Sequence, residues 1–130
     1  FNEAERSYDE KIALVCESLG FSTYLPHRDA GLQDQQNAHA IFNTDIANLE
    51  KAELLVANLD GLDVDSGTAW EIGFTIARGK KVIGLRTDNR WFEPWARVNL
   101  MIEQSVNMVN SFEELRHALD AWKKEVALKS

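Results

Sequence analysis

The stretch LDGLDVDSGTAWEIG, residues 59–73, is the strongest indication of the fold of this 130-residue chain. The apolar run over residues 54–59 leads into it and does not alternate with polar residues, which predicts a strand buried on both faces of a parallel sheet. A loop rich in Asp and Gly follows. Residues 68–77 then predict a helix that is apolar almost all round, with Glu71 as its only charge. A carboxylate in the first turn of a helix, just past a strand end, lies where open α/β sheets bind ligands.

The segments on either side alternate between helical and extended patterns. This alternation predicts right-handed βαβ units, and therefore an α/β fold with a parallel sheet and helices on both faces. We expect one domain over residues 1–130, and a strand before Phe1 that would complete a sheet of about five strands. The predicted helices cover residues 3–19, 34–49, 98–103 and a last segment from 111, and the predicted strands cover residues 21–25, 54–59, 82–85 and 105–109.

Composition excludes several classes of function. The net charge of −7 argues against nucleic acid or an anionic membrane as partner, and no apolar run approaches a membrane span. The single cysteine, Cys16, excludes an intrachain disulfide, fits a reducing cytoplasmic compartment, and lies on a helical stripe as a small buried hydrophobe. No metal site and no cofactor is expected, because the histidines are not at ligand spacing and no glycine-rich phosphate motif occurs.

A second carboxylate points inward on the helix predicted over residues 34–49. Asp45 falls on the apolar stripe of that helix, where a charge is costly unless something pairs with it. Either Asp45 serves the site of Glu71, or it lies at the edge of the stripe and caps a neighbouring loop. Asp34 is the candidate N-cap of the helix. The stripe consists of Ala38, Ile41, Phe42, Ile46 and Leu49.

Two loops leave alternatives open. Residues 27–31 either line a pocket or form a solvated connection. The loop over residues 87–97 carries Trp91, Phe92 and Trp95, which either cover a pocket or interface or pack down on the core. Further along, Ser111 and Glu114 form a capping-box pattern that opens the last helix.

The acidic residues of the opening stretch suit chemistry at a glycosidic carbon. One ionised carboxylate attacks the anomeric carbon and forms a glycosyl ester, while another assists departure of the leaving group. A helix N-terminus would favour the ionised form of Glu71. However, Thr68 and Glu71 also fit a capping box, with Thr68 as the N-cap. Spacing alone therefore leaves a catalytic and a structural interpretation open.

Three segments carry a resemblance to the nucleoside 2-deoxyribosyltransferase family. They are Asn43-Thr44-Asp45, the run from Ala52 to Gly61, and DSGTAWEIG over residues 65–73. The segment VNLMIE over residues 98–103 is similar to the family as well, and the likeness runs from Phe1 to about Val109.

The resemblance implies a flavodoxin-like three-layer sandwich that moves 2-deoxyribose between nucleobases by a ping-pong route, in nucleoside salvage. It makes Glu71 the nucleophile that carries the 2-deoxyribosyl group, and it assigns Asp65 and Asp45 to the base and its proton. The implied partners are 2′-deoxynucleosides, free nucleobases and further copies of the chain, since active sites would be shared in a homo-oligomer. The implied substrate-binding residues are Asn99 and Met101, which would reach a neighbouring subunit's site, with Gly67 and Asp60.

Two other functions use the same crevice. In a deoxynucleoside 5′-monophosphate N-glycosidase, water replaces the acceptor base. In a non-catalytic nucleotide-binding module, the ligand is held without turnover.

Overall fold

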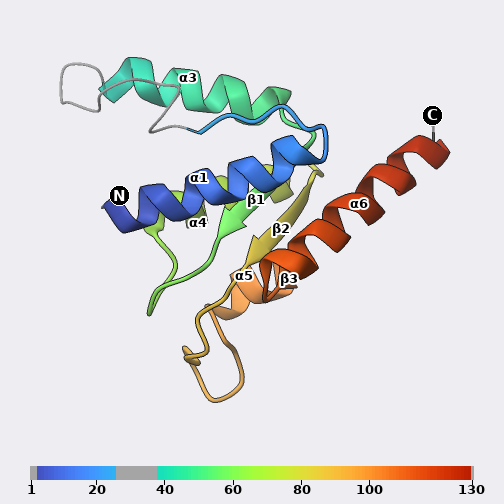
Figure 1. Cartoon of the computed structure of the whole chain (residues 1–130). Helices are drawn as coiled ribbons and strands as arrows, with labels where there is room; N and C mark the ends of the chain where they lie inside the picture. Colours follow the sequence, from blue (N-terminus) through green and yellow to red (C-terminus); the bar gives the residue numbers. More distant parts are fainter. Residues whose placement is uncertain (1–2, 26–37, 130) are drawn as a thin grey trace. The chain divides into compact units, whose positions relative to one another are not determined.

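The computed structural model describes residues 3–25 and 38–129 (Figure 1). They divide into two compact units, Phe1–Ala52 and Glu53–Ser130. A single domain over the whole chain stays a prediction. None of the helices in the described ranges is long and apolar enough to cross a membrane.

The first unit contains helices α1 (Glu3–Ser18) and α3 (Ala38–Lys51). The prediction for α1 is confirmed: it buries a stripe that includes Cys16, and the chain leaves it at Gly20, whose φ of 91° suits a residue without a Cβ. For α3 the expected stripe is wrong in part, because Ala38 is exposed and Phe42 is 51% exposed. Its more protected positions are Ile41, Asp45, Ile46, Asn48 and Leu49, so the protected face includes Asp45 but not Phe42. The predicted N-cap Asp34 and the loop 27–31 lie outside the described residues.

The predicted strand over residues 21–25 is wrong. This segment has no regular secondary structure. Strands exist only in pairs, because each needs a neighbour for its backbone hydrogen bonds. In the flavodoxin-like order 2-1-3-4-5, the neighbour of the strand after the first helix is the strand before that helix. No such strand occurs among the described residues of the first unit.

The second unit is built on a parallel sheet, as predicted. Its strands are β1 (Leu54–Asn58), β2 (Lys81–Leu85) and β3 (Asn107–Val109), in the order β1-β2-β3. Both pairings are parallel. The sheet of the described residues thus has three strands where about five were expected.

Helices α4 (Ser66–Ala77) and α6 (Phe112–Lys129) flank this sheet, and α5 (Leu100–Ser105) is short (Figure 1). Helix α4 packs on β1 and β2, and α6 packs on β2 and β3. A core cluster of aliphatic side chains joins β1 and β2 to α4 and the neighbouring loops: Ala57, Leu59, Val64, Ile72, Val82 and Val98. Although α4 is apolar in sequence, one face of it remains open, since Trp70 is 49% exposed and stacks on Phe74.

The predicted capping box of the last helix is confirmed with one change. The Ser111 hydroxyl accepts a hydrogen bond from the Glu114 backbone N–H at 3.0 Å. The Glu114 carboxylate accepts from the backbone N–H of Asn110, at 3.2 Å, rather than from that of Ser111. The first turn of α6 is therefore closed by side chains on both sides.

Candidate functional site

The carboxyl ends of the parallel strands meet at one edge of the sheet in the second unit. The loop after β1 and the start of α4 emerge there, and so does the loop after β2. Open α/β sheets bind their ligands at this edge. The candidate residues of the second unit belong to these loops, to α4 and to α5.

Asp65 is the N-cap of α4. Its side-chain Oδ2 accepts a hydrogen bond from the Thr68 backbone N–H at 3.1 Å. The helix therefore begins at Ser66, two residues earlier than predicted, and Thr68 is its third residue. The alternative in which Thr68 caps the helix and Glu71 reaches back to it is wrong.

Glu71 consequently lies in the second turn of α4 and not in the first, which corrects its expected position. No acidic residue lies in the first turn, so the partial positive charge of the helix end acts most directly on Asp65. The Glu71 side chain is half-buried. Its backbone carbonyl accepts a hydrogen bond from the Thr75 hydroxyl at 2.8 Å.

The backbone of Gly67 lies close to the side chain of Asp65. A Cβ on Gly67 would lie 3.2 Å from the Asp65 Oδ2 atom. A side chain there would crowd the carboxylate that caps α4. Gly67 thus keeps room beside Asp65, and its contact with a substrate stays a prediction.

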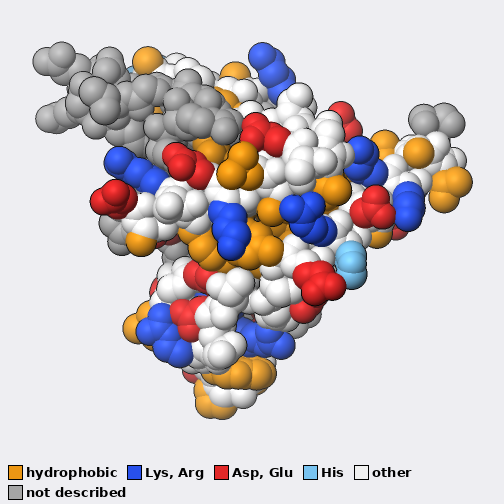
Figure 2. Space-filling model, in the orientation of Figure 1, with side chains coloured by type: hydrophobic (Ala, Val, Ile, Leu, Met, Phe, Trp, Pro, Cys, Tyr) orange, Lys and Arg blue, Asp and Glu red, His pale blue; other side chains and the backbone are white. Residues whose placement is uncertain are grey.

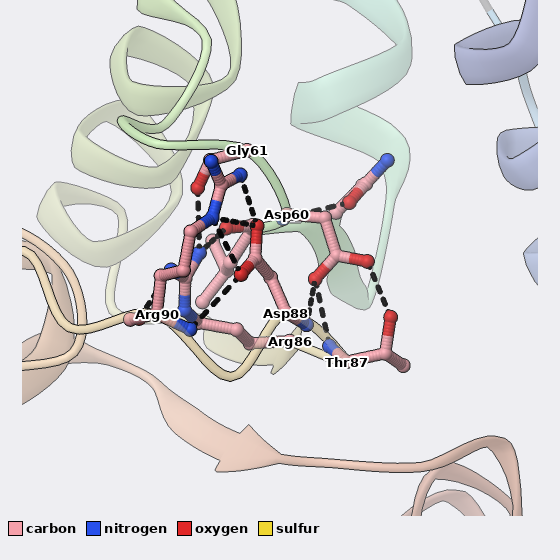
Figure 3. Close-up of polar contacts among 8 residues, drawn as sticks. Asp60, Gly61, Arg86, Thr87, Asp88 and Arg90 are labelled. Carbon is pink, nitrogen blue, oxygen red and sulfur yellow. Dashed lines mark hydrogen bonds and ion pairs between the residues drawn. The ribbon is translucent and has the colours of Figure 1, made fainter.

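Asp60 ties the loop after β1 to the loop after β2 (Figure 3). Its Oδ1 accepts from the backbone N–H groups of Thr87, at 2.7 Å, and Asp88, at 3.0 Å. Its Oδ2 accepts from the Thr87 hydroxyl at 2.5 Å. Gly61, the next residue, has a φ of 109°, which L side chains rarely adopt. The geometry gives Asp60 a structural role, and its contact with a substrate stays a prediction.

Arg86 is a residue that the sequence analysis missed. It directly follows β2 and is only 1% exposed. Its guanidinium donates to the backbone carbonyls of Leu59 at 2.6 Å, Gly61 at 3.0 Å and Arg90 at 2.8 Å. The sequence does place an arginine directly after a buried apolar run. This pattern does not by itself predict burial, because arginines in solvated loops occupy the same position.

A surface ion pair lies next to Arg86. The guanidinium of Arg90 contacts the Asp88 carboxylate at 2.6 Å. Hydrogen bonds from Arg90 hold the pKa of the Asp88 carboxyl well below its usual range, and the nearby charge of Arg86 adds to this. The same pair raises the pKa of Arg90.

Asn99 and Met101 belong to α5. Asn99 is its N-cap, since its Oδ1 accepts from the Met101 backbone N–H at 2.9 Å. The Met101 side chain is 74% exposed. The structure thus leaves the Met101 side chain pointing to solvent at this edge of the second unit.

The aromatic loop over residues 87–97 does not pack down on the core, so that alternative is wrong. Trp91 is 57% and Trp95 68% exposed, and a tight turn pairs Glu93 with Ala96. The Arg97 guanidinium lies over the Trp91 ring, 5.8 Å from its centroid. Figure 2 shows hydrophobic side chains gathered at the lower end of the view, where Figure 1 draws this loop.

Asp45 lies on α3, in the first unit. It is half-buried, and its Oδ1 accepts a hydrogen bond from the Tyr24 hydroxyl at 2.8 Å. Tyr24 was also missed from sequence, because it lies 21 residues away in a segment that was expected to be a strand. Among the described residues, no group of three or more His, Cys, Asp or Glu side chains is placed to hold a metal ion.

Several solved structures share this fold. A conserved protein from Enterococcus faecalis V583 is 27% identical, with 93% of this chain and 92% of that chain covered and a TM-score of 0.74. A 2-deoxyribosyltransferase from Bacillus psychrosaccharolyticus is 23% identical, with 89% and 84% covered and a TM-score of 0.72. A CMP N-glycosidase from Clostridium botulinum is 24% identical, with 92% of each chain covered and a TM-score of 0.59.

No curated protein sequence matches the chain. Residues 1–114, by contrast, match the family described as nucleoside 2-deoxyribosyltransferase. This match extends past the acidic loop, α4 and α5 into the start of α6. The chain therefore belongs to the nucleoside 2-deoxyribosyltransferase family.

Proposed function

We propose that the protein transfers 2-deoxyribose between nucleobases through a covalent 2-deoxyribosyl ester on Glu71. The observation that carries this proposal is that Asp65, and not Glu71, caps the N-terminus of α4. Asp65 caps the N-terminus of the helix, so Glu71, six residues further along, is not needed as a cap. Membership of the family supports a nucleoside-processing enzyme, either a transferase or an N-glycosidase.

The reaction has two balanced halves. A Glu71 carboxylate oxygen attacks C1′ of the donor, the N-glycosidic bond breaks, and its electron pair leaves with the base nitrogen. A proton from Asp65 or Asp45 goes to that nitrogen. In the second half a nitrogen of the acceptor base attacks C1′, the ester bond breaks, and the carboxylate of Glu71 is restored. The acceptor's proton returns to the aspartate.

Hydrolysis is the second candidate, and the fold likeness to a CMP N-glycosidase favours testing it. Water would then attack C1′ of the ester instead of the acceptor base. A deoxynucleoside 5′-monophosphate is the donor in this alternative, and its phosphate would need a pocket of its own.

One experiment separates these functions from simple binding. Deoxyinosine is incubated with the protein, with and without free adenine, and the products are separated by chromatography. Deoxyadenosine that forms only when adenine is present supports transfer. Hypoxanthine released equally without an acceptor contradicts transfer and supports hydrolysis, for which deoxycytidine 5′-monophosphate is tested as donor. Nucleoside binding with neither product supports a non-catalytic module.

The role of Glu71 is tested with the isosteric variant Glu71→Gln. We expect base exchange to disappear while the unfolding transition stays close to that of the parent. Glu125→Gln, on the exposed face of α6, makes the same chemical change and should leave exchange intact. Acid-quenched protein mixed with donor alone should carry a 2-deoxyribosyl mass on the peptide that contains Glu71. Exchange that survives Glu71→Gln would sink the proposal.

We also propose that the active protein is a cytoplasmic homo-oligomer with shared sites, acting in nucleoside salvage. The exposure of Leu100, at 51%, and of Met101, at 74%, supports a partner surface next to the N-cap Asn99. Replacing Met101 by Glu should lower both the assembled mass, measured by light scattering, and the exchange rate. An unchanged mass with a full exchange rate would contradict this part.

A further inference from the structure

Arg86 stands out because it carries a charge in a place that favours apolar side chains. It follows Val82, Ile83 and Leu85, all of them buried, and is itself 1% exposed. Burying a charge is costly, and replacing a buried ionic group by an apolar one of similar volume is often neutral or stabilising. A buried arginine at this position therefore depends on the hydrogen bonds that its guanidinium makes.

Among the described residues, the hydrogen bonds of the Arg86 side chain are to backbone carbonyls of two loops and not to a carboxylate. Its guanidinium donates to the carbonyls of Leu59 and Gly61 in the loop after β1, and to the carbonyl of Arg90 in the loop after β2. Guanidinium presents several donors in one rigid plane, so it fixes the separation of the two loops. Its Nε atom is buried, and the described residues provide no partner for it.

Asp60 makes the reciprocal connection. It belongs to the loop after β1, and its carboxylate accepts from Thr87 and Asp88 in the loop after β2 (Figure 3). The two side chains thus cross between the same two loops in opposite directions. The backbone of Arg86 is anchored as well, since its N–H donates to Val109 O at 2.9 Å and Asn110 Nδ2 donates to its carbonyl oxygen at 3.1 Å.

The loop held in this way leads directly into the candidate site. Only Leu62, Asp63 and Val64 separate Gly61 from Asp65, the N-cap of α4. The side chain of Val64 is buried in the core, so the loop is held at its start by Arg86 and at its end by Val64 and the cap. Because only three residues lie between Gly61 and Asp65, we expect a shift of Gly61 to change the position of the Asp65 carboxylate.

We propose that Arg86 is a positioning residue for the reaction, which fixes the loop 59–65 so that Asp65 and Glu71 meet the sugar and base in a productive geometry. This inference rests on the proposed function. A displacement of about 1 Å in a reacting group can reduce turnover by about 100-fold while ground-state binding persists. The signature of positioning is thus a fall in kcat with little change in KM.

The test compares the same substitution at two arginines four residues apart. Arg86→Lys keeps the charge but replaces the planar fork by a single ammonium, which cannot reach all three carbonyls. Arg90→Lys removes an exposed guanidinium whose partner is Asp88, and it leaves the Arg90 carbonyl in place. We expect kcat to fall about 10- to 100-fold in Arg86→Lys, with KM within about threefold of the parent, and both constants to be nearly unchanged in Arg90→Lys.

Three results would overturn the proposal: a full kcat in Arg86→Lys, an equal loss in both variants, or a loss that only follows the unfolded fraction. If Arg86→Lys does not fold, Arg86→Met is tested in its place by the same criteria. Chemical rescue adds a second criterion, since guanidinium at millimolar concentration should restore part of the kcat of Arg86→Ala and none of that of Glu71→Gln.

A readout without turnover keeps the two proposals apart. Amide hydrogen exchange is measured over residues 60–68 in the parent, in Arg86→Lys and in Arg90→Lys. Faster amide exchange in Arg86→Lys alone supports the role of Arg86 in fixing the loop 59–65. This holds even if the parent shows no transfer, in which case only the proposed function fails. If amide exchange over residues 60–68 is unchanged in Arg86→Lys, Arg86 does not fix this loop. That result overturns the inference regardless of the transfer activity.

Discussion

A pair of glycines gives a sharp test of the packing in the second unit. Gly84 lies in the central strand β2, and Gly73 lies in α4. A Cβ on Gly84 would lie 2.5 Å from Leu59 Cδ1 and 3.1 Å from Val106 Cγ2. A Cβ on Gly73 would meet nothing within 4 Å. One chemical change, Gly to Ala, should therefore have opposite effects at the two positions.

The magnitudes follow from these distances. Carbon atoms pack best at about 3.5–4.0 Å, so the methyl group that Gly84→Ala adds would overlap Leu59 by roughly 1 Å. Leu59 is fully buried and cannot swing into solvent. Overpacking of this kind costs about 1–3 kcal/mol, offset by about 0.5–1 kcal/mol because the unfolded chain loses glycine's freedom. The centre of these ranges is a net loss of about 1 kcal/mol for Gly84→Ala. We expect Gly73→Ala to gain about 0.5–1 kcal/mol from helix propensity.

The assay is urea unfolding followed by circular dichroism, with the slope of the transition compared among the three proteins. A common slope means that the midpoints report stability directly. A neutral or stabilising Gly84→Ala would refute the close approach of β2 to Leu59. A destabilising Gly73→Ala would refute the open space beside α4, and would point to a surface that covers this face.

Three further predictions concern single side chains. Asp65→Asn keeps an oxygen that accepts from Thr68 and should unfold like the parent, whereas Asp65→Ala should lose about 1 kcal/mol; full base exchange in Asp65→Asn would contradict a proton-handling role for this carboxylate. Burial raises the pKa of the Cys16 thiol from 9.0 to about 11, so Cys16 should resist a thiol reagent at pH 8 until urea unfolds the protein. Because the pKa of Cys16 is raised in the folded state, its contribution to stability is full below about pH 9 and is lost as the pH rises towards about 11. The unfolding free energies of the parent and of Cys16→Ala, measured by urea titration, should therefore converge over that range. A constant difference between them would contradict this expectation. Tyr24→Phe removes the hydrogen bond to Asp45 at little steric cost, and we expect a lower rate of base exchange with an unchanged circular dichroism spectrum. An unaltered rate would show that transfer does not need this contact.

The parts of the fold that sequence predicted well depend on local patterns. The apolar runs of β1 and β2 and the stripe of α1 are visible because burial imposes a pattern on neighbouring residues. The start of α4 was misplaced because Asp65 and Thr68 are both good N-caps, and only the folded loop selects between them. The segment 21–25 was misjudged because a strand depends on a distant partner, which a local pattern does not contain.

The candidate site divides in the same way. Glu71 and Asp65 could be proposed as site residues from sequence because they share one short stretch with a clear strand-loop-helix pattern. Arg86 and Tyr24 were missed because their roles come from contacts across 27 and 21 residues of sequence. An arginine after a strand is usually solvated, and no local sequence pattern predicts that two loops will bury it.

The exposed tryptophans of the loop between β2 and α5 provide a built-in optical probe. Trp91 and Trp95 face solvent at the sheet edge where the acidic loop emerges, so their emission should be red-shifted and open to collisional quenchers. A nucleobase or a second chain that arrives at this edge would shield them and move the emission to shorter wavelength. Titrations of nucleosides into Glu71→Gln can thus be followed by intrinsic fluorescence, without a label and without turnover.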